Sequence, residues 1–311
     1  MAGLQDKFSA RNCKVIGLSV DPVGSHSDWI KDIEETQNTK VDFPIIADSK
    51  KEVAELYVVA PEVNNSGAQI ELIELDVTKN DTIIEVLDTI KSKTGRLDYL
   101  INNAGYGLGG FFEDITEHEF RQQMETNFFG LLNVTKQALP LMRKTALDNY
   151  NVRIVNISSV QARAPMPGLS AYATSKWAVE GFSEALYHEL LPFGIKVILV
   201  EPGSYRTEIF TSNAKIAKGS SEEHSPYNKY SNAFRGKIDE MTKGGTVGMG
   251  EDPKVVADLI QQALESNSPK LRYVVGRDAK MRILLRALLP TKYYARILHK
   301  VLFNKSFSKG N

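Results

Sequence analysis

The sequence predicts an α/β fold, doubly wound, with a mainly parallel sheet and helices on both faces. Three observations lead to this class. Short apolar runs alternate with longer stretches of helical spacing along the chain, which is typical of βαβ units. No internal repeat or low-complexity segment interrupts this alternation. The 311 residues are 42% hydrophobic and 24% charged, which is ordinary for a globular protein of one large or two smaller domains.

The first predicted unit comprises residues 1–57. Its first apolar run, residues 13–20, is typical of a buried strand, and the polar residues that follow it favour a helix N-terminus near residue 25. Proline, asparagine and glycine then predict a loop over residues 58–68. The expected elements of this unit are strands at 13–20 and 43–47 and helices at 25–35 and 51–57.

The second predicted unit comprises residues 69–311. A strand at 70–75 ends at Asp76, and apolar residues recur at helical spacing over 80–94. Residues 204–250 have little apolar periodicity, and long irregular stretches of this kind are commonly lids or binding loops, with a disordered insertion as the alternative. The remaining expected elements are strands at 97–101, 153–157, 196–200 and 271–275 and helices around 117–145 and at 171–191 and 253–266.

The charge and cysteine content exclude several classes of protein. The chain has 38 Lys/Arg and 38 Asp/Glu, and this balance argues against a nucleic-acid binder. Cys13 is the only cysteine, so neither an intramolecular disulfide nor a thiolate metal cluster is expected, and the histidines show no metal-ligand spacing. The N-terminus has no apolar signal-peptide core and no window matches a membrane span, which predicts a cytoplasmic protein.

The C-terminal tail, residues 278–311, is basic and amphipathic. From Lys270 onward there are eleven Lys/Arg and one acid, Asp278, so this stretch carries +10 and the rest of the chain −10. Two apolar stripes with interspersed bases cover 280–289 and 293–303. They could form a membrane-surface helix pair, a substrate lid or homo-oligomer contact, or a helix that covers the core. A lid would suit a small apolar substrate.

Tyr172, Lys176 and Ser159 form a candidate proton-transfer group. Tyr172 and Lys176 are four residues apart, so on a helix they share one face. An ammonium beside a phenol favours the phenolate and lowers its pKa, which suits a general acid or base near neutral pH. Ser159 follows an apolar run and could hydrogen-bond a substrate oxygen. Such a pair also recurs by chance on ordinary helix surfaces.

Six motifs follow one another along the chain, at Asp76, at Asn103, Ala104 and Gly105, at Asn127, at Ser159, at Tyr172 and Lys176, and at Pro202, Gly203 and Thr207. In this order they resemble the motifs of the short-chain dehydrogenase/reductase family. In that family the first meets the adenine ring, the second forms the cofactor-side turn, the next three form the catalytic tetrad, and the last is the nicotinamide turn. The segment from Leu271 to Pro290 is similar to the members near hydroxysteroid and retinol dehydrogenases.

The resemblance implies a Rossmann-like fold and hydride transfer between NAD or NADP and an apolar alcohol or ketone of steroid, retinoid or lipid type. Tyr172 would then exchange the proton, and Lys176 would lower its pKa. Both residues would also bind the cofactor, with Lys176 holding the nicotinamide ribose. Ser159 would orient the substrate oxygen, and Asn127 would anchor a water in the proton relay.

The front of the chain departs from this family. The family begins with T-G-x-x-x-G-x-G, whose glycines let the backbone approach the pyrophosphate at a helix N-terminus. In the nearest register here only Gly24 matches a glycine. Pro22 removes an amide donor, and Asp21 would place a negative charge near the phosphates.

Residues 7–57 instead resemble a fragment of a one-cysteine peroxiredoxin. Cys13 does not match that family's peroxidatic cysteine and is expected to be a small buried side chain. The fragment would replace the first βαβ unit of the sheet, with strand 13–20 central and Asp48 either at a ribose or in a loop. The alternative to an oxidoreductase is therefore a chimeric Rossmann-type protein that does not bind a dinucleotide.

Overall fold

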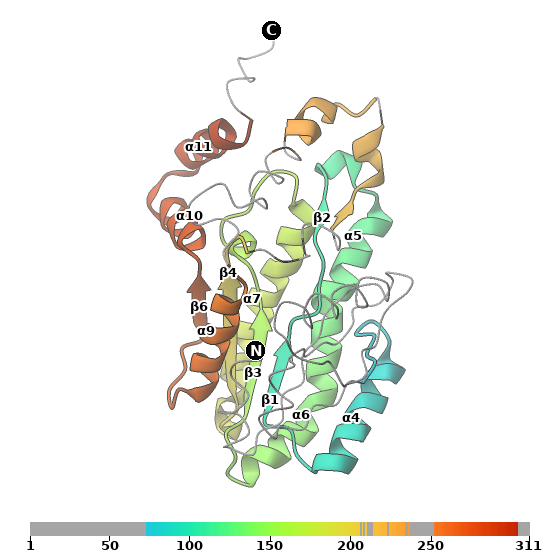
Figure 1. Cartoon of the computed structure of the whole chain (residues 1–311), viewed down its shortest axis with the longest axis vertical. Coiled ribbons are helices and arrows are strands. Elements are labelled where there is room, and N and C mark those ends of the chain that lie inside the picture. Colours follow the sequence, from blue (N-terminus) through green and yellow to red (C-terminus); the bar gives the residue numbers. More distant parts are fainter. Residues whose placement is uncertain are drawn as a thin grey trace, which may run out of the picture.

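Four parallel strands form the central sheet of the computed structural model (Figure 1). The structure describes residues 73–205, 207, 209, 214–222, 224–233, 236 and 252–303. In the register of neighbouring strands, Ile101 lies opposite Val155, and Val155 lies opposite Ile198. The predicted fold class is confirmed. The strands, in their order in the sheet, are β1 (Tyr99–Asn102), β3 (Arg153–Ile157), β4 (Lys196–Pro202) and β6 (Arg272–Val275).

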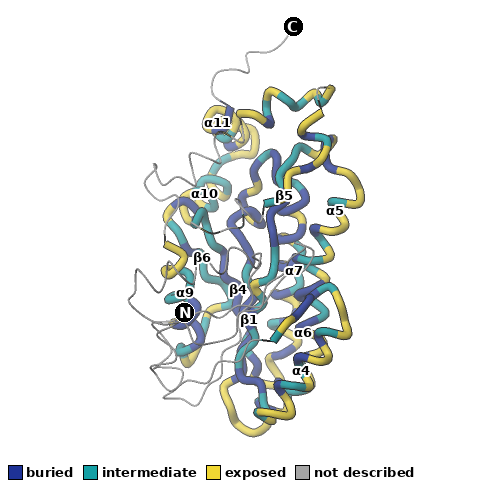
Figure 2. The backbone as a smooth tube through the Cα atoms, turned by 45° about the vertical axis from the view of Figure 1, so that its right-hand side comes forward, coloured by how far each residue is buried: buried dark blue, intermediate teal, exposed yellow. Residues whose placement is uncertain are grey.

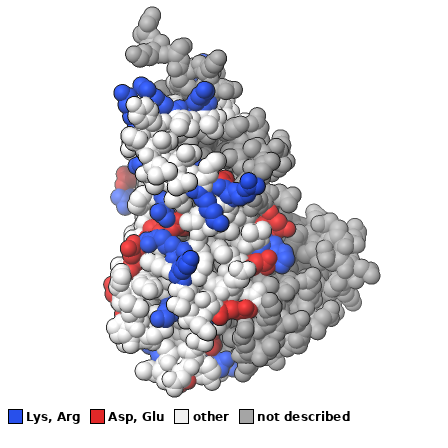
Figure 3. All heavy atoms as spheres, turned by 90° about the vertical axis from the view of Figure 1, so that its left-hand side faces the viewer, with Lys and Arg blue, Asp and Glu red and all other residues white. Residues whose placement is uncertain are grey.

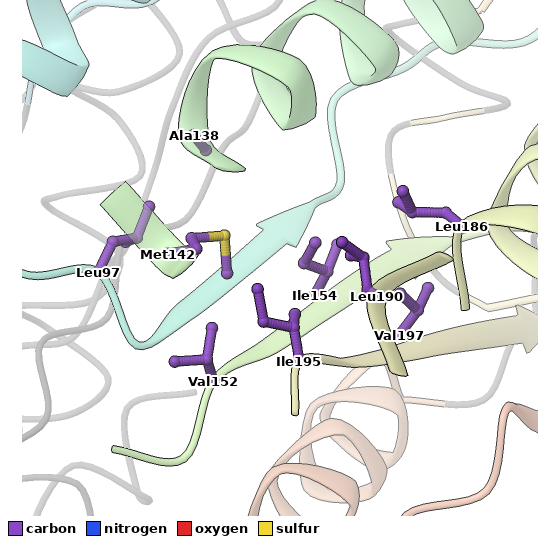
Figure 4. Packing of buried hydrophobic residues seen from close by; sticks show 9 residues of the cluster. All are labelled: Leu97, Ala138, Met142, Val152, Ile154, Leu186, Leu190, Ile195 and Val197. Carbon is purple, nitrogen blue, oxygen red and sulfur yellow. The ribbon is translucent and has the colours of Figure 1, made fainter. Parts of the chain in front are cut away.

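Helices cover both faces of this sheet. On one face, α6 (Leu131–Leu147) and α7 (Ser170–Leu190) pack against β3 and β4 through a buried aliphatic cluster (Figure 4). α4 (Asn80–Thr94) lies beside α6 on the same face. On the opposite face, α9 (Lys254–Glu265) packs against the other side of the strands. Strand side chains point alternately to the two faces, so one sheet supplies both cores.

Local sequence signals explain where the helices begin and end. α4 ends at Gly95, which adopts a left-handed φ of 69° and donates its N–H to the Lys91 carbonyl. α5 (Glu117–Met124) begins with a capping box, in which Thr116 and Glu119 each satisfy a backbone N–H of the other. The helix predicted at 80–94 and the strand predicted at 153–157 are confirmed with the same boundaries.

One expectation for the described elements is wrong in part. Residues 73–75 of the expected strand at 70–75 lie in no strand, although Leu75 is buried. The side chain of Leu75 packs against α4, so the apolar residues that suggested a strand are explained by burial. The two helical stretches predicted around 117–145 are present as α5 and α6, and one turn of π-helix, η3 (Glu125–Gly130), connects them. Everything predicted for residues 1–57 and 58–68, including Cys13 and Asp48, lies outside the described residues.

The remaining elements lie at the carboxyl end of the sheet (Figure 1). Within the predicted loop 204–250, β5 (Lys215–Ile216) pairs with β2 (Leu108–Gly109), followed by η7 (Lys218–Ser221). The two apolar stripes of the tail are helices α10 (Arg277–Leu288) and α11 (Thr291–Phe303). The central strands β3 and β4 are mostly buried, and Figure 2 shows the outer faces of the helices exposed. No described helix is long and apolar enough to cross a membrane.

Candidate active site

Tyr172, Lys176 and Ser159 come together at the carboxyl end of the sheet. Tyr172 and Lys176 lie in the first turns of α7 and are each 3% exposed. The N–H of Ser158 donates to the Val200 carbonyl, which extends the pairing of β3 and β4 and holds Ser159 beside α7. Ser159 and Tyr172 share a side-chain hydrogen bond. The structure therefore brings together the three residues predicted for proton transfer.

Lys176 is a buried cation with limited hydrogen bonding. Its Nζ donates to the Ile157 carbonyl at 2.8 Å and lies 5.8 Å from the centre of the Tyr172 ring. Burial lowers the pKa of Lys176 to about 8, and the charge of Glu180 acts in the opposite direction. An ammonium has three N–H donors, and among the described residues the Ile157 carbonyl is the one hydrogen-bond acceptor of Lys176. Donors therefore remain for a bound hydroxyl group.

The pKa of Tyr172 differs from the expectation. Burial raises the pKa of Tyr172 to about 12, and its hydrogen bond with Ser159 offsets only part of that rise. The expected lowering of this pKa by Lys176 is absent in this structure. The main cause is desolvation, because burial of the Tyr172 side chain penalises its charged form.

Asn127 fixes the backbone of the cofactor-side turn. It lies in the π-helix η3, and its amide donates to the Tyr106 carbonyl at 3.0 Å while its oxygen accepts the Tyr106 N–H at 3.1 Å. The amide also donates to Oγ of Ser175, which donates to the Tyr172 carbonyl. Asn127 thus connects this turn to α7. A π-turn of this kind is frequent at functional sites, and helical periodicity in the sequence does not predict it.

The turn after β1 is held by polar contacts within the fold. Asn102 donates to Thr135 of α6 and to Asn156 of β3. Asn103 and Ala104 line a mostly apolar pocket between α4, α6 and β1. A Cβ at Gly105 would lie 3.0 Å from the Asn127 oxygen, so this position has little room for a side chain.

Asp76 is engaged in local contacts. Its carboxylate accepts from the N–H and hydroxyl of Thr78 at 2.9 and 2.6 Å and pairs with Lys79 at 3.0 Å. Asp76 is 4% exposed and precedes α4. These contacts give Asp76 a structural role in the turn before α4, and its predicted contact with adenine stays a prediction.

The predicted nicotinamide turn follows β4 and is anchored by Asp278. The N–H of Gly203 donates to the Val275 carbonyl, and the N–H of Ser204 donates to the Asp278 carboxylate at 2.9 Å. A Cβ at Gly203 would collide with that carboxylate. Thr207, the last residue of the motif, is exposed. Motif matching did not find Asp278. The sequence feature that could have pointed to it is that Asp278 is the one acid among the eleven bases from Lys270 onward.

Aromatic and apolar side chains form a cluster at the N-terminal end of α7, which begins after Leu169. Phe111 stacks on Tyr227 with ring centres 4.7 Å apart, and Tyr230 meets Phe303 of α11 at 5.8 Å. Part of the predicted loop 204–250 therefore packs against the end of α11. The same cluster contains Met166, Leu169 and Leu302, and the first two lie between Ser159 and Tyr172 in the chain. Within the described ranges, no cluster of His, Cys, Asp and Glu could hold a metal ion.

A family model for short chain dehydrogenases matches residues 39–217. Its match contains Asp76, the turn after β1, all four tetrad residues and the turn after β4. The matched region begins at residue 39, inside the range 7–57 that is expected to resemble a peroxiredoxin fragment. That resemblance stays a prediction, and so does the boundary between two units at residues 58–68.

Three curated relatives align over most of the chain. The uncharacterized oxidoreductase YusZ of Bacillus subtilis is 39% identical and the alignment covers 84% of this chain and 91% of that protein. The 3-ketodihydrosphingosine reductase of Bacteroides thetaiotaomicron is 36% identical, with 71% and 78% covered. Retinol dehydrogenase 7 of Mus musculus is 33% identical, with 73% and 72% covered.

Solved structures share the same fold. A short-chain dehydrogenase from Streptomyces avermitilis is 34% identical, has a TM-score of 0.60, and covers 74% of this chain and 79% of its own. A Burkholderia cenocepacia structure in complex with NADP has a TM-score of 0.54 at 22% identity, with 76% and 82% covered. A structure from Burkholderia phymatum in complex with NAD has a TM-score of 0.56 at 23% identity, and the alignment covers 68% of this chain and 73% of that one. From its family match, its curated relatives and its fold, the chain belongs to the short-chain dehydrogenase family.

Proposed function

We propose that this protein is an oxidoreductase that transfers a hydride between NAD or NADP and an apolar alcohol or ketone, with Tyr172 as proton donor and acceptor. The observation that carries the proposal is the buried group of Ser159, Tyr172 and Lys176 at the carboxyl end of a parallel sheet. Ligands of open α/β sheets bind at this edge. Ser159 shares a hydrogen bond with the Tyr172 phenol, so a substrate oxygen can meet both hydroxyl groups at one point.

The residues present fit the nicotinamide half of a dinucleotide. Lys176 is a buried ammonium with donors left for ribose hydroxyls, and no carboxylate is the hydrogen-bond partner of its Nζ among the described residues. The turns after β1 and β4 lie on either side of this group and have glycines at Gly105 and Gly203. A bound nicotinamide supplies the hydride, and the protein supplies position and electrostatics. The NADP- and NAD-bound neighbours with the same fold support this choice of cofactor.

The proton chemistry follows from the chain's own groups. In the reducing direction Tyr172 gives its proton to the substrate oxygen, and Ser159 holds that oxygen by a hydrogen bond. Lys176, as a cation next to the phenol ring, then stabilises the phenolate that forms. In the oxidising direction the same groups act in reverse, with Tyr172 as the base.

The neighbouring apolar cluster supports an apolar substrate. Its aromatic and aliphatic side chains come from the loop around Phe111, from the segment 166–169 and from α11. Apolar pockets with a few convergent polar groups are the usual form of small-molecule sites. The names of two relatives, a 3-ketodihydrosphingosine reductase and a retinol dehydrogenase, point to the same substrate class.

Replacement of Tyr172 tests the mechanism. Oxidation of NADH or NADPH should be followed with a panel of apolar ketones for the wild type and for Tyr172→Phe. We expect the variant to lose at least about 100-fold in kcat, because a positioned acid contributes roughly that much or more. Tyr187→Phe, on the same helix but outside this group, should retain wild-type turnover. Equal rates for Tyr172→Phe and wild type would refute the assigned role.

The alternative is a Rossmann-type protein that does not bind a dinucleotide, and it is motivated by the missing glycine-rich motif before residue 57. Calorimetric titration of the full chain with NADH and with NADPH separates the two hypotheses. We expect micromolar binding of at least one of them. Absence of heat and of binding with both would favour the alternative.

A further inference from the structure

Helices α10 and α11 expose apolar side chains on one stripe each. On α10 these are Met281, Leu284 and Leu288, which are 56%, 57% and 69% exposed. Their spacing of three and four residues places them on one face of the helix. On α11 the stripe repeats every four residues, and its members are Tyr293, Ile297 and Val301 at 55%, 43% and 56% exposure.

These stripes are separate from the face that stabilises the fold. On α11 the residues that face the protein are Tyr294, Leu302 and Phe303, which are buried. Tyr294 packs with Val160 and Ala279, whereas Leu302 and Phe303 join the cluster around Met166 and Leu169. The helices are thus attached to the protein by one face and leave a second apolar face uncovered among the described residues.

Basic residues border the exposed stripes. Arg277 and Lys280 on α10 and Lys292, Arg296 and Lys300 on α11 are all exposed. The one acid of these helices, Asp278, is 5% exposed, because it faces inward to the turn after β4. Figure 3 views this side of the molecule, and its upper part shows basic side chains on a surface with little acidic colour.

We propose that α10 and α11 bind the surface of a lipid bilayer that contains anionic lipids. The exposed apolar stripes would enter the boundary between headgroups and acyl chains, and the bases would contact lipid phosphates and carboxylates. An apolar stripe bordered by Lys and Arg is the pattern of helices that lie in a membrane interface. Neither helix crosses the bilayer.

Charge favours a bilayer over a second copy of the chain. A two-fold dimer through this surface would place the same basic patch on both sides of the interface. Like charges brought together in this way oppose association. An anionic bilayer instead offers charge of the opposite sign over its whole area, together with an apolar interior for the exposed stripes.

This surface also lies close to the candidate active site. The end of α11 packs on residues 166–169, which lie between Ser159 and Tyr172 in the chain. If the proposed function holds, a bilayer at α10 and α11 would bring a dissolved apolar substrate beside the aromatic cluster. The binding surface itself does not depend on catalysis.

Vesicle co-sedimentation of the full-length protein tests the proposal. Vesicles of phosphatidylcholine alone should be compared with vesicles that contain about a third phosphatidylserine, at low and high salt. We expect binding to the anionic vesicles that weakens as salt rises, because salt screens charge attraction. No binding to anionic vesicles at low salt would overturn the proposal.

Two double variants resolve the contributions of apolar and basic side chains. Leu284→Gln with Leu288→Gln should abolish most vesicle binding, whereas Leu147→Gln with Leu191→Gln, also exposed but on other elements, should not. Arg296→Gln with Lys300→Gln should weaken binding by about fivefold per charge, and Lys91→Gln with Lys93→Gln on α4 should leave it unchanged. Unaltered binding in both tail variants would overturn the assignment of this surface.

Two further measurements separate membrane binding from self-association and from catalysis. Light scattering that shows a wild-type dimer and monomeric tail variants, without vesicle binding, would assign the surface to self-association and overturn the proposal. Tyr172→Phe should bind vesicles as the wild type does. Vesicle binding is therefore measured independently of turnover, so a failure of the proposed function and a failure of this inference give different results.

Discussion

Burial controls the two ionisable side chains at the centre of the site. It raises the pKa of Tyr172 to about 12 and lowers the pKa of Lys176 to about 8. Both shifts favour the neutral form, because a charge in an apolar surrounding loses its hydration. The phenol is therefore held as a proton donor at neutral pH. The charge of Lys176 is the component that changes within the range in which enzymes are assayed.

The pH profile of ketone reduction should report this lysine. Reduction requires protonated Tyr172, which is present below about pH 12, and charged Lys176, which is present below about pH 8. The value of kcat/KM reflects the pKa values of the free enzyme. We expect kcat/KM for reduction to stay constant up to about pH 8 and then to decrease about tenfold per pH unit.

Measurement of initial rates from pH 6 to pH 10 at low substrate checks this prediction. Tyr187→Phe should give the same profile as the wild type. A profile that rises through pH 8, or stays flat to pH 10, would contradict the assignment of the titrating group to Lys176.

At the scale of elements, Asp278 connects the tail to the turn after β4. Gly276 is the N-cap residue before α10 and has a φ of 105°. A Cβ at this position would lie 2.7 Å from the Asp278 carboxylate. The carboxylate accepts the Ser204 N–H and leaves no space for a side chain at Gly203. The position of the turn thus depends on a residue about seventy positions later in the chain.

Asp278→Ala should loosen this turn. The Ser204 N–H would lose its acceptor, and an unsatisfied buried donor costs about 1–3 kcal/mol of unfolding free energy. Because the turn is proposed to meet the nicotinamide, KM for NADH or NADPH should rise more than kcat falls. Urea unfolding and steady-state kinetics measure the two effects.

Asp278→Asn is the matched test of this contact, because its amide oxygen can still accept the Ser204 N–H. It should restore most of the stability and of the KM. Asp81→Ala, in the first turn of α4, controls for loss of an acid at a helix start. An Asp278→Ala enzyme with wild-type KM would show that the contact has no part in cofactor binding.

The sequence predicts the elements well where local signals decide and poorly where distant partners decide. The helix at 80–94 follows from its periodicity and from Gly95, and the strand at 153–157 from a continuous apolar run. The π-turn around Asn127 arises from contacts with Tyr106 and Ser175, which no local pattern encodes. Motif spacing predicts that Ser159, Tyr172 and Lys176 come together, but the pKa shifts of Tyr172 and Lys176 depend on burial in the folded chain.

At the scale of the whole molecule, positive charge is concentrated near the C-terminus, and the residues expected to bind the two ends of the cofactor lie in different parts of the chain. The stretch from Lys270 carries +10 and the rest −10, so a neutral chain has a basic side formed by the tail. The proton-transfer residues lie in the described core, whereas the expected place for the pyrophosphate lies in residues 1–57, outside it. Cytoplasmic localisation and the peroxiredoxin-like origin of that unit stay predictions.

Thermal unfolding of the full chain measures whether the two parts bind a dinucleotide together. A ligand that binds only the folded state stabilises it by about 2.7 kcal/mol at 100 times its Kd. For a chain of this size we expect NADH or NADPH to raise Tm by about 5 °C at that concentration, since each kcal/mol shifts Tm by a few degrees. Tyr187→Phe should show the same rise, because it lies on α7 outside the proposed site. ADP, which lacks nicotinamide, should raise Tm less than either dinucleotide. A cooperative transition with an unchanged Tm in both dinucleotides would mean that the site has the proton-transfer residues of a dehydrogenase without its cofactor.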